Sequence, residues 1–314
     1  MLFVIRPVVN RAVLSRVLRI RTLSATAISA ERLLDAATVN RLVGSSDFQV
    51  KLLDVRAPER YSEGHIPNAV NIHTFFTYLA TSDRQGVQDL KSTFENLLQD
   101  AGVNGTDDEH VIAYEDSLRT LYGASCRALY VLKLLGHPRV SVLNGGFEGW
   151  SERGYATTIE VPQVSKGTFQ ARWTPSIWSG RDDVVTALRD GDAVLLDVRD
   201  MEEWNGTSSS PYGVDFAPRK GRLPGAVHIL WKDLMEKRGD GMIHFKEPDE
   251  IRRICAEKGV TPDKKVIIYC FKGARASNTY IALKEAGFDD VTNYFASWNE
   301  WSRDDSLGID SERY

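Results

Sequence analysis

The sequence predicts an α/β protein of two similar domains, each with a mostly parallel β-sheet covered by helices on both faces. Short apolar segments rich in β-branched residues alternate with helical patterns along the chain, which is typical of parallel sheets. The same segments return in the same order in the second half. With 314 residues, the chain is long enough for two domains.

Four segments of the first half recur in the second. The matched ranges are 52–56 with 195–199, 64–72 with 221–229, 111–114 with 266–269, and 132–150 with 283–301. The last pair aligns without a gap, so that Trp150 matches Trp301. Four matches in one order indicate a duplicated domain. In the first copy, Asp54 and Arg56 end a strand and are expected to form an ion pair, as are their counterparts in the second.

The composition is that of an ordinary globular protein. Hydrophobic residues make up 42% and charged residues 26%, and the net charge is -4. This balance argues against a surface for nucleic acid, and no membrane partner is expected. The three cysteines, Cys126, Cys255 and Cys270, are far apart, with no Cys-x-x-Cys pair. Their spacing fits neither the usual zinc motifs nor a disulfide scaffold.

Residues 1–28 differ from the rest of the chain. They carry five arginines and no acidic residue, and Arg11, Arg16 and Arg19 fall on one side of a helical wheel, with apolar residues on the other. An amphipathic, arginine-rich and acid-poor start is typical of a mitochondrial transit peptide. We therefore expect a mitochondrial matrix protein whose mature chain begins near Ser24. An ordinary N-terminal helix and a secretory signal are the alternatives.

The segment 266–286 contains the strongest candidate for chemistry. Residues 266–269 predict a buried strand and residues 277–286 a helix, so Cys270 begins the loop between them. Ligands bind at this edge of an α/β sheet, and the amides at a helix start favour an anion. Together with Lys272 and Arg275 they would favour the thiolate, the nucleophilic form of cysteine. The alternative, an inert buried cysteine, does not explain two nearby cations.

The loop from Cys270 to Arg275 resembles the active-site loop of the rhodanese, or sulfurtransferase, superfamily, which often reads Cys-x-x-Gly-x-Arg. Four residues separate Cys270 from Arg275, whereas the related phosphatase loop has five. The shorter loop suits sulfur rather than a phosphoryl group. The resemblance implies that Cys270 carries a persulfide. It also implies that the donor is bound by loop residues, which are Phe271, Lys272, Gly273, Ala274 and Arg275.

The tandem arrangement resembles that of two-domain sulfurtransferases, and so does the segment 296–301. We expect a non-catalytic rhodanese-like domain in residues 29–155, a surface linker in residues 156–178, and a catalytic rhodanese-like domain in residues 179–314. The first copy has Glu115 where the second has Cys270, and its loop is four residues longer. A carboxylate cannot carry a sulfane sulfur, which is why the first copy is expected to be structural or to form one wall of a cleft.

The second copy contains an insertion of fourteen residues between Arg199 and the turn that begins at Gly221. Long loops at the ligand edge of a sheet are often functional. Arg219 near its end matches a substrate-binding arginine of the family, although a solvated basic turn is the alternative. Glu203 stands where the vertebrate-type enzymes carry a second anion-binding arginine, and this departure leaves the fine substrate specificity open.

The resemblance implies transfer of a sulfane sulfur from thiosulfate or 3-mercaptopyruvate to an acceptor such as cyanide, glutathione or a dithiol protein. It implies no metal or organic cofactor. Because Lys272 places a cation inside the loop, thiosulfate is the expected donor. Two other classes stay open: a catalytically weak interaction or persulfide-carrier module with the same fold, and a phosphatase that uses the same thiolate. The physiological acceptor, the pathway and the oligomeric state do not follow from the sequence.

Overall fold

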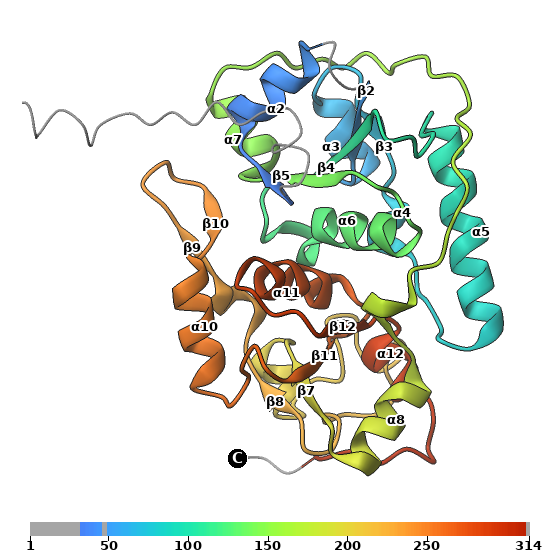
Figure 1. Cartoon of the computed structure of the whole chain (residues 1–314), viewed down its shortest axis with the longest axis vertical. Helices are drawn as coiled ribbons and strands as arrows, with labels where there is room; N and C mark the ends of the chain where they lie inside the picture. Colours follow the sequence, from blue (N-terminus) through green and yellow to red (C-terminus); the bar gives the residue numbers. More distant parts are fainter. Residues whose placement is uncertain (1–31, 46–48, 312–314) are drawn as a thin grey trace, which may run out of the picture.

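The computed structural model describes residues 32–45 and 49–311. The expected transit peptide and its cleavage site near Ser24 lie outside the described residues. Two five-stranded parallel sheets form the centres of two domains, which lie one above the other in Figure 1. The predicted α/β fold with helices on both faces of each sheet is confirmed.

The N-terminal domain has the strand order β1-β5-β4-β2-β3. Its strands are β1 (Leu33–Leu34), β2 (Gln49–Asp54), β3 (Val70–Asn71), β4 (Glu109–Tyr114) and β5 (Val140–Leu143). Its helices are α2 (Ala36–Val43), α3 (Pro58–Glu63), α4 (Thr74–Thr77), α5 (Arg84–Asp100), the 3-10 turn η1 (Thr120–Tyr122), α6 (Ala124–Leu134) and α7 (Gly146–Glu152).

The C-terminal domain repeats this order as β6-β12-β11-β7-β8. Its strands are β6 (Trp178–Ser179), β7 (Ala193–Asp197), β8 (Val227–His228), β11 (Lys265–Tyr269) and β12 (Val291–Tyr294), with a separate hairpin of β9 (Met235–Lys237) and β10 (Ile243–Phe245). Its helices are η2 (Pro175–Ile177), α8 (Arg181–Asp190), α9 (Met201–Trp204), η3 (Trp231–Leu234), α10 (Pro248–Ala256), α11 (Ala274–Glu285) and α12 (Ser297–Trp301).

The two copies keep the same register. Asp54 pairs with Tyr114 across β2 and β4, and Asp197 pairs with Tyr269 across β7 and β11. In each copy, the strand-end aspartate forms the predicted ion pair with an arginine two residues later, at 2.6 Å. The pairs are fully buried, so each carboxylate is compensated by the guanidinium instead of water.

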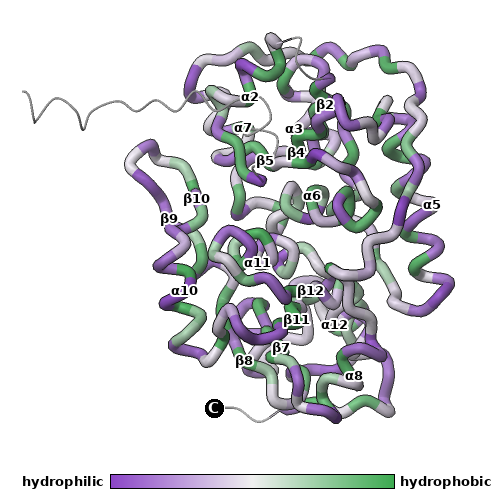
Figure 2. The backbone as a smooth tube through the Cα atoms, in the orientation of Figure 1, coloured by the Kyte–Doolittle hydropathy of each residue, from purple (hydrophilic) through white to green (hydrophobic). Residues whose placement is uncertain are grey.

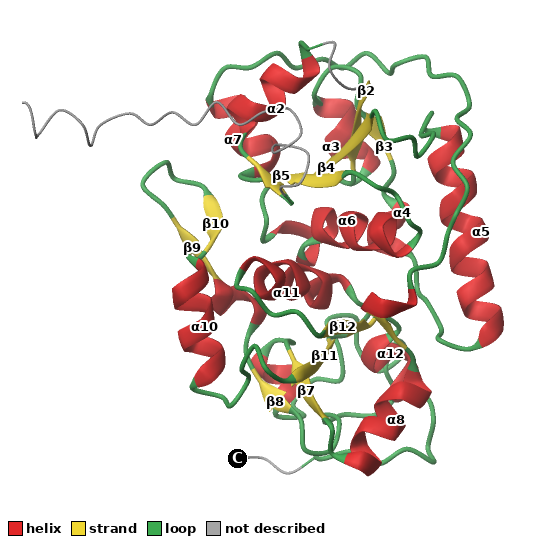
Figure 3. Ribbon diagram, viewed as in Figure 1, coloured by secondary structure: helices red, strands yellow, loops and turns green. Residues whose placement is uncertain are grey.

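One hydrophobic core runs through both domains, because α6 and α11 pack against each other between the two sheets. Figure 3 shows these helices side by side at the centre of the molecule. In Figure 2, the central strands are mostly coloured as hydrophobic, whereas α5 and α10 carry many hydrophilic residues toward the outside. The far face of each sheet has its own smaller apolar cluster. The two domains are therefore joined by one continuous core.

The expected linker runs along the N-terminal domain as an extended and largely exposed segment. It first forms an antiparallel bridge between Thr158 and His65. Its last residues form η2 and begin β6, which joins the second sheet. Within the described part of the chain, no helix is long and apolar enough to cross a membrane.

Candidate active site

Cys270 lies directly after β11, at the carboxyl edge of the second sheet, as predicted. The loop reaches α11 within three residues because Gly273 adopts a left-handed conformation (φ 86°) at the helix N-cap. A side chain at Gly273 would also meet the Phe295 carbonyl oxygen at 2.6 Å. This tight turn points the Gly273 N–H at the Cys270 Sγ, with an N–S distance of 3.1 Å. The backbone thus stabilises negative charge on sulfur.

A second segment, at the start of α12, holds the loop from the other side. Cys270 donates its N–H to the Ser297 hydroxyl at 3.1 Å, and Trp298 donates its N–H to the Cys270 carbonyl at 3.0 Å. Asn299 does the same for the Phe271 carbonyl at 2.9 Å. The loop is therefore preorganised by hydrogen bonds on both sides of the sulfur.

A small pocket lies beside Cys270. Its lining consists of Tyr122, Pro211, Tyr212, Cys270, Phe271, Lys272, Ala274 and Arg275. Cys270 is only 1% exposed, and the free volume is about 10 Å³, which is room for a single water molecule. Tyr122, from the N-terminal domain, and Tyr212, from the insertion, line this space from outside the loop.

Lys272 carries the unbalanced positive charge of the loop. Its ammonium lies 3.9 Å from the centre of the Phe76 ring and 5.0 Å from that of Tyr212, and within the described ranges no carboxylate pairs with it. Cation–π contacts of this kind leave the ammonium poorly solvated. Burial, aided by the charge of Arg127, lowers the pKa of Lys272 to about 7. A bound anion would supply the missing counter-charge.

Arg275 lines the pocket but is bound elsewhere. Its guanidinium donates to both carboxylate oxygens of Glu203 and to Asp200. Burial acts to lower the pKa of Arg275, but the charge and hydrogen bonds of Glu203, together with the charges of Cys270 and Asp200, outweigh it and the pKa is raised. Glu203 thus neutralises Arg275. Arg275 links the loop to the insertion and adds little net charge to the pocket.

We predicted from the sequence that Arg219 contacts the donor. In the structure, Arg219 does not line the pocket of Cys270. Its guanidinium donates to backbone carbonyls at and beyond the end of α12, which belong to Trp301, Ser302, Asp304 and Leu307. Its own carbonyl accepts from the Trp298 indole N–H at 3.1 Å. The insertion folds back over the C-terminal segment at this point, so Arg219 fastens the chain away from the sulfur.

Arg127 brings a second cation toward the site from α6 of the N-terminal domain. It donates to the carbonyls of Phe75, Phe76 and Tyr78 at 2.8–3.0 Å. Burial lowers its pKa to about 10, so it stays charged at neutral pH, and a negative charge on Cys270 stabilises it. By holding these carbonyls, Arg127 positions the Phe76 ring against Lys272.

The first copy places a carboxyl group in the equivalent loop. The Glu115 carboxylate accepts the N–H groups of Ala124 and Ser125 at the start of α6, both at 3.2 Å, and the Ser125 hydroxyl at 2.7 Å. Glu115 is 1% exposed, and burial raises its pKa to about 8. The first copy thus fills its loop with a built-in carboxyl group, where the second has a sulfur.

The other two cysteines lack such surroundings. Cys126 is fully buried in α6, and burial raises its pKa. Cys255 is buried in α10, where burial raises its pKa to about 12. Neither cysteine lies in the strand-to-helix loop of its copy, where Cys270 lies. Among residues 32–45 and 49–311, no three His, Cys, Asp or Glu side chains are grouped to hold a metal ion.

Four side chains of the site were not expected from the sequence: Phe76, Tyr122, Arg127 and Tyr212. Two of them carried a signal. Arg127 lies in a mostly apolar helix, which indicates a buried cation with a specific partner. Tyr122 lies in the extra length of the first copy's loop, where it and Leu121 adopt positive φ angles of 57° and 46°. Such strain is common at functional sites.

The model of the "Rhodanese-like domain" family matches residues 35–153 and 181–304. The chain belongs to this family. Each match covers one copy of the duplicated unit, and the predicted resemblance to two-domain rhodanese-type sulfurtransferases is confirmed.

Two curated relatives cover most of the chain. A "Putative thiosulfate sulfurtransferase" of Haloferax volcanii is 34% identical over 263 residues, covering 82% of this chain and 87% of the relative. A "3-mercaptopyruvate sulfurtransferase" of Escherichia coli K12 is 29% identical over 278 residues, covering 84% and 93%. Among solved structures, that of EanB is similar with a TM-score of 0.75 and 22% identity, covering 90% of this chain and 69% of that one. At this identity the last likeness shows the fold.

The lowered pKa of Lys272 predicts a pH dependence. Below pH of about 7 the ammonium is charged and attracts an anionic donor, and above it the charge is lost. For thiosulfate, we therefore expect kcat/KM of the unmodified protein, divided by that of Lys272→Arg, to fall as the pH rises through 7. The guanidinium of the variant stays charged, and ionisation of Cys270 affects both proteins. A ratio that stays constant from pH 6 to 9 would contradict the assigned role.

Proposed function

We propose that this family member transfers a sulfane sulfur from thiosulfate to a thiophilic acceptor through a persulfide on Cys270. The observation that carries the proposal is the Cys270 loop, in which a backbone N–H meets the sulfur and Lys272 has no carboxylate partner among the described residues. This arrangement suits a nucleophile that must form, hold and release an anionic sulfur.

In the first step, the Cys270 thiolate attacks the outer sulfur of thiosulfate. A new S–S bond forms to Cys270, the S–S bond of thiosulfate breaks, and its electron pair leaves with sulfite. The Lys272 ammonium offsets the charge of the incoming dianion and of the departing sulfite. Amides of residues 271–276 stabilise the sulfur before and after the transfer, as the Gly273 N–H does for the free thiol group.

In the second step, an acceptor nucleophile attacks the outer sulfur of the persulfide and regenerates the Cys270 thiolate. Cyanide would leave as thiocyanate, and a thiol would leave as a persulfide. Glutathione or a dithiol protein are the proposed physiological acceptors. Because Cys270 is 1% exposed, either must enter past Tyr122 and Tyr212, as the donor does.

Thiosulfate is favoured over 3-mercaptopyruvate because of where the net charge lies. Lys272 lies inside the loop, next to the sulfur that is transferred, and suits a compact dianion. The carboxylate of mercaptopyruvate lies further from its sulfur and would need a cation at greater reach. Arg275 is neutralised by Glu203, and Arg219 is engaged with backbone carbonyls. Neither is available for that carboxylate.

A rhodanese-fold module that binds a partner without catalysis is the second candidate. Such a module would need the interface between the two domains. It would not need the charges of Lys272 and Arg275 beside Cys270. The Lys272 ammonium lies against the Phe76 ring, and the Cys270 sulfur accepts a backbone hydrogen bond. Both features favour an enzyme over a binding module.

A further proposal concerns location. The arginine-rich, acid-poor residues 1–28 support import into the mitochondrial matrix with cleavage near Ser24. A matrix enzyme would meet thiols such as glutathione as acceptors.

Cys270→Ser should abolish transfer, because it removes the sulfur that forms the persulfide while changing a single atom. In intact-mass analysis, the unmodified protein incubated with thiosulfate should gain one sulfur that cyanide removes. Cys126→Ser and Cys255→Ser are matched controls and should gain it normally. Loss of the added sulfur from either control, with Cys270→Ser still labelled, would refute the assignment.

Lys272→Met should reduce kcat/KM for thiosulfate by about ten- to a hundredfold, the worth of one charge-assisted contact with a bound anion. Activity with 3-mercaptopyruvate should fall much less. Lys220→Met is the control, because it removes the same charge from an exposed lysine of the insertion that does not line the pocket. Unchanged thiosulfate kinetics in Lys272→Met would show that the loop charge does not select the donor.

Residues 1–28 fused to a fluorescent protein should direct it to mitochondria and be cleaved. Replacing Arg11, Arg16 and Arg19 together by Glu should leave the fusion in the cytosol, because import needs the positive face of the helix. Microscopy and the mass of the processed fusion measure the two effects. Import that survives the triple replacement would argue against a transit peptide.

A further inference from the structure

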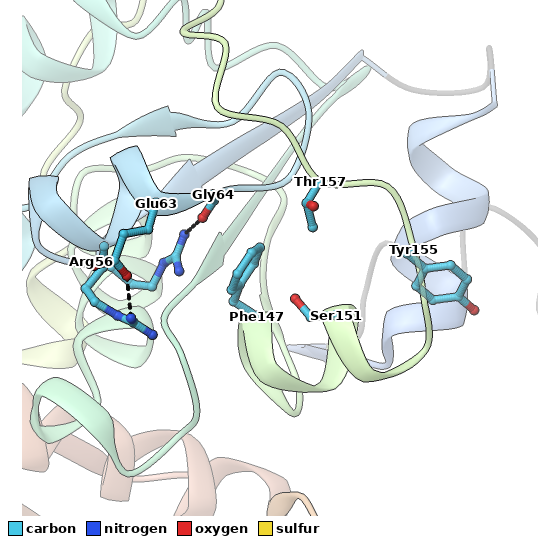
Figure 4. Close-up of a pocket in the computed structure, with 8 residues that line it drawn as sticks. Arg56, Glu63, Gly64, Phe147, Ser151, Tyr155 and Thr157 are labelled. Carbon is cyan, nitrogen blue, oxygen red and sulfur yellow. Dashed lines mark hydrogen bonds and ion pairs between the residues drawn. The ribbon is translucent and has the colours of Figure 1, made fainter.

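The N-terminal domain has an open pocket of its own, with a volume of about 330 Å³. It is lined by Arg56, Arg60, Glu63, Gly64, Phe147, Ser151, Tyr155 and Thr157. Figure 4 shows Ser151 at the end of α7 and Thr157 on the segment that follows, with Arg56 and Glu63 across from them. The pocket shares no lining residue with that of Cys270. It lies at the carboxyl edge of the first sheet, where α/β proteins bind ligands.

The second copy builds the same framework. The Arg56 guanidinium lies 4.0 Å from the centre of the Phe147 ring, and its counterpart Arg199 lies 4.7 Å from that of Trp298. Each arginine also donates to the carbonyl of a glycine, Gly64 in the first copy and its equivalent in the second. The floor of the pocket is therefore common to both domains.

The rim corresponds as well. The Trp150 indole N–H donates to the carbonyl of Ala156, and the Trp301 indole N–H donates to that of Gly308. These bonds fold the chain back after α7 and after α12 in the same way. The bridge between His65 and Thr158 has its counterpart in a bridge between residues 222 and 310.

In the second copy a guanidinium fills the equivalent place. Arg219, two residues before Gly221, donates to four carbonyls of this rim. The carbonyls belong to Trp301, Ser302, Asp304 and Leu307, which correspond to Trp150, Ser151, Arg153 and Tyr155. The negative end of a helix and the carbonyls that follow it attract a cation, and a planar guanidinium can donate to several of them at once.

The first copy lacks a residue that could do the same. Between Arg56 and Gly64 it has a single cation, Arg60, which is paired with Glu63 and Asp116. Arg56 is likewise paired with Asp54 and Asp116. Arg56, Arg60 and Glu63 line the open space, while Asp54 and Asp116 pair with the two arginines from outside the lining. The three carboxylates exceed the two guanidinium groups by one negative charge, which a positive ligand would balance.

We propose that this pocket binds a guanidinium group from outside the chain, in the manner in which Arg219 fills its counterpart. The ligand is either an arginine side chain of a polypeptide or a free small guanidino compound. Its donors reach the carbonyls at the end of α7, and its charge is balanced by Glu63, the carboxylate that lines the pocket. An ammonium group has the charge but lacks the planar fork that serves several carbonyls in one plane.

The test is a titration of the full-length protein, followed by NMR or calorimetry, with N-acetyl-arginine amide. N-acetyl-citrulline amide is the matched probe, because it has nearly the same shape but no charge. We expect saturable binding of the arginine probe with a dissociation constant in the millimolar range, and binding of the citrulline probe about tenfold weaker or more. Equal binding of both probes, or no saturable binding of either, would overturn the proposal.

Two variants locate the site. Glu63→Gln should weaken binding of the arginine probe severalfold, since it removes one counter-charge. Ser151→Trp should fill the pocket and abolish binding; Ser151 is exposed, and the melting curve should match that of the unmodified protein. A blocked pentapeptide with a central arginine, compared with methylguanidinium, distinguishes the sources: tighter binding of the peptide indicates a polypeptide ligand, and equal binding a small molecule. Arginine binding that persists in Ser151→Trp would refute the pocket as its site.

Discussion

The packing of α6 against α11 is the contact on which the active site depends. It joins the cores of the two domains and brings two equivalent loops, those of Glu115 and Cys270, to the starts of neighbouring helices. Charge buried at such an interface must be compensated within the protein, because water is excluded. Arg127 meets this need from the first domain, since it binds three carbonyls and also faces the negative charge of Cys270. The first copy thus contributes a cation to the surroundings of Cys270 in the second.

The two copies place different chemical groups in equivalent loops before a helix. A loop whose amides converge before a helix favours an anion. In the first copy a carboxyl group occupies it permanently, which makes that loop a structural element. In the second copy, the Cys270 sulfur occupies the loop and can form a bond to a substrate. Four additional residues in the first loop place Tyr122 in the lining of the Cys270 pocket, so the loop of Glu115 helps to enclose the site of the second domain.

The sequence predicted the features that depend on neighbouring residues and missed those that depend on distant ones. The duplicated fold, the position of Cys270 and the cation of Lys272 follow from strand and helix patterns within a short segment. Arg219 was misplaced because a long insertion can take many paths, and its guanidinium found backbone carbonyls some 80 residues further along the chain. The contacts of Lys272 with Phe76 and Tyr212 join three segments, and no local pattern contains them.

The balance of charge in the pocket also explains why we expect Lys272 to have a large effect on thiosulfate turnover. Of the cations near Cys270, Arg275 is neutralised by Glu203, and Arg127 is tied to carbonyls that fix its position. Lys272 has only the two aromatic rings as described partners, and burial brings its pKa to about 7. An ammonium held this close to losing its proton gains more from a nearby anion than a solvated lysine does. The thiolate, the donor and the departing sulfite are each such an anion. In the proposed first step, attack of the Cys270 thiolate on the thiosulfate dianion gives a perthiolate anion on Cys270 and a sulfite dianion, so the Lys272 ammonium still has a negative sulfur beside it after sulfite departs.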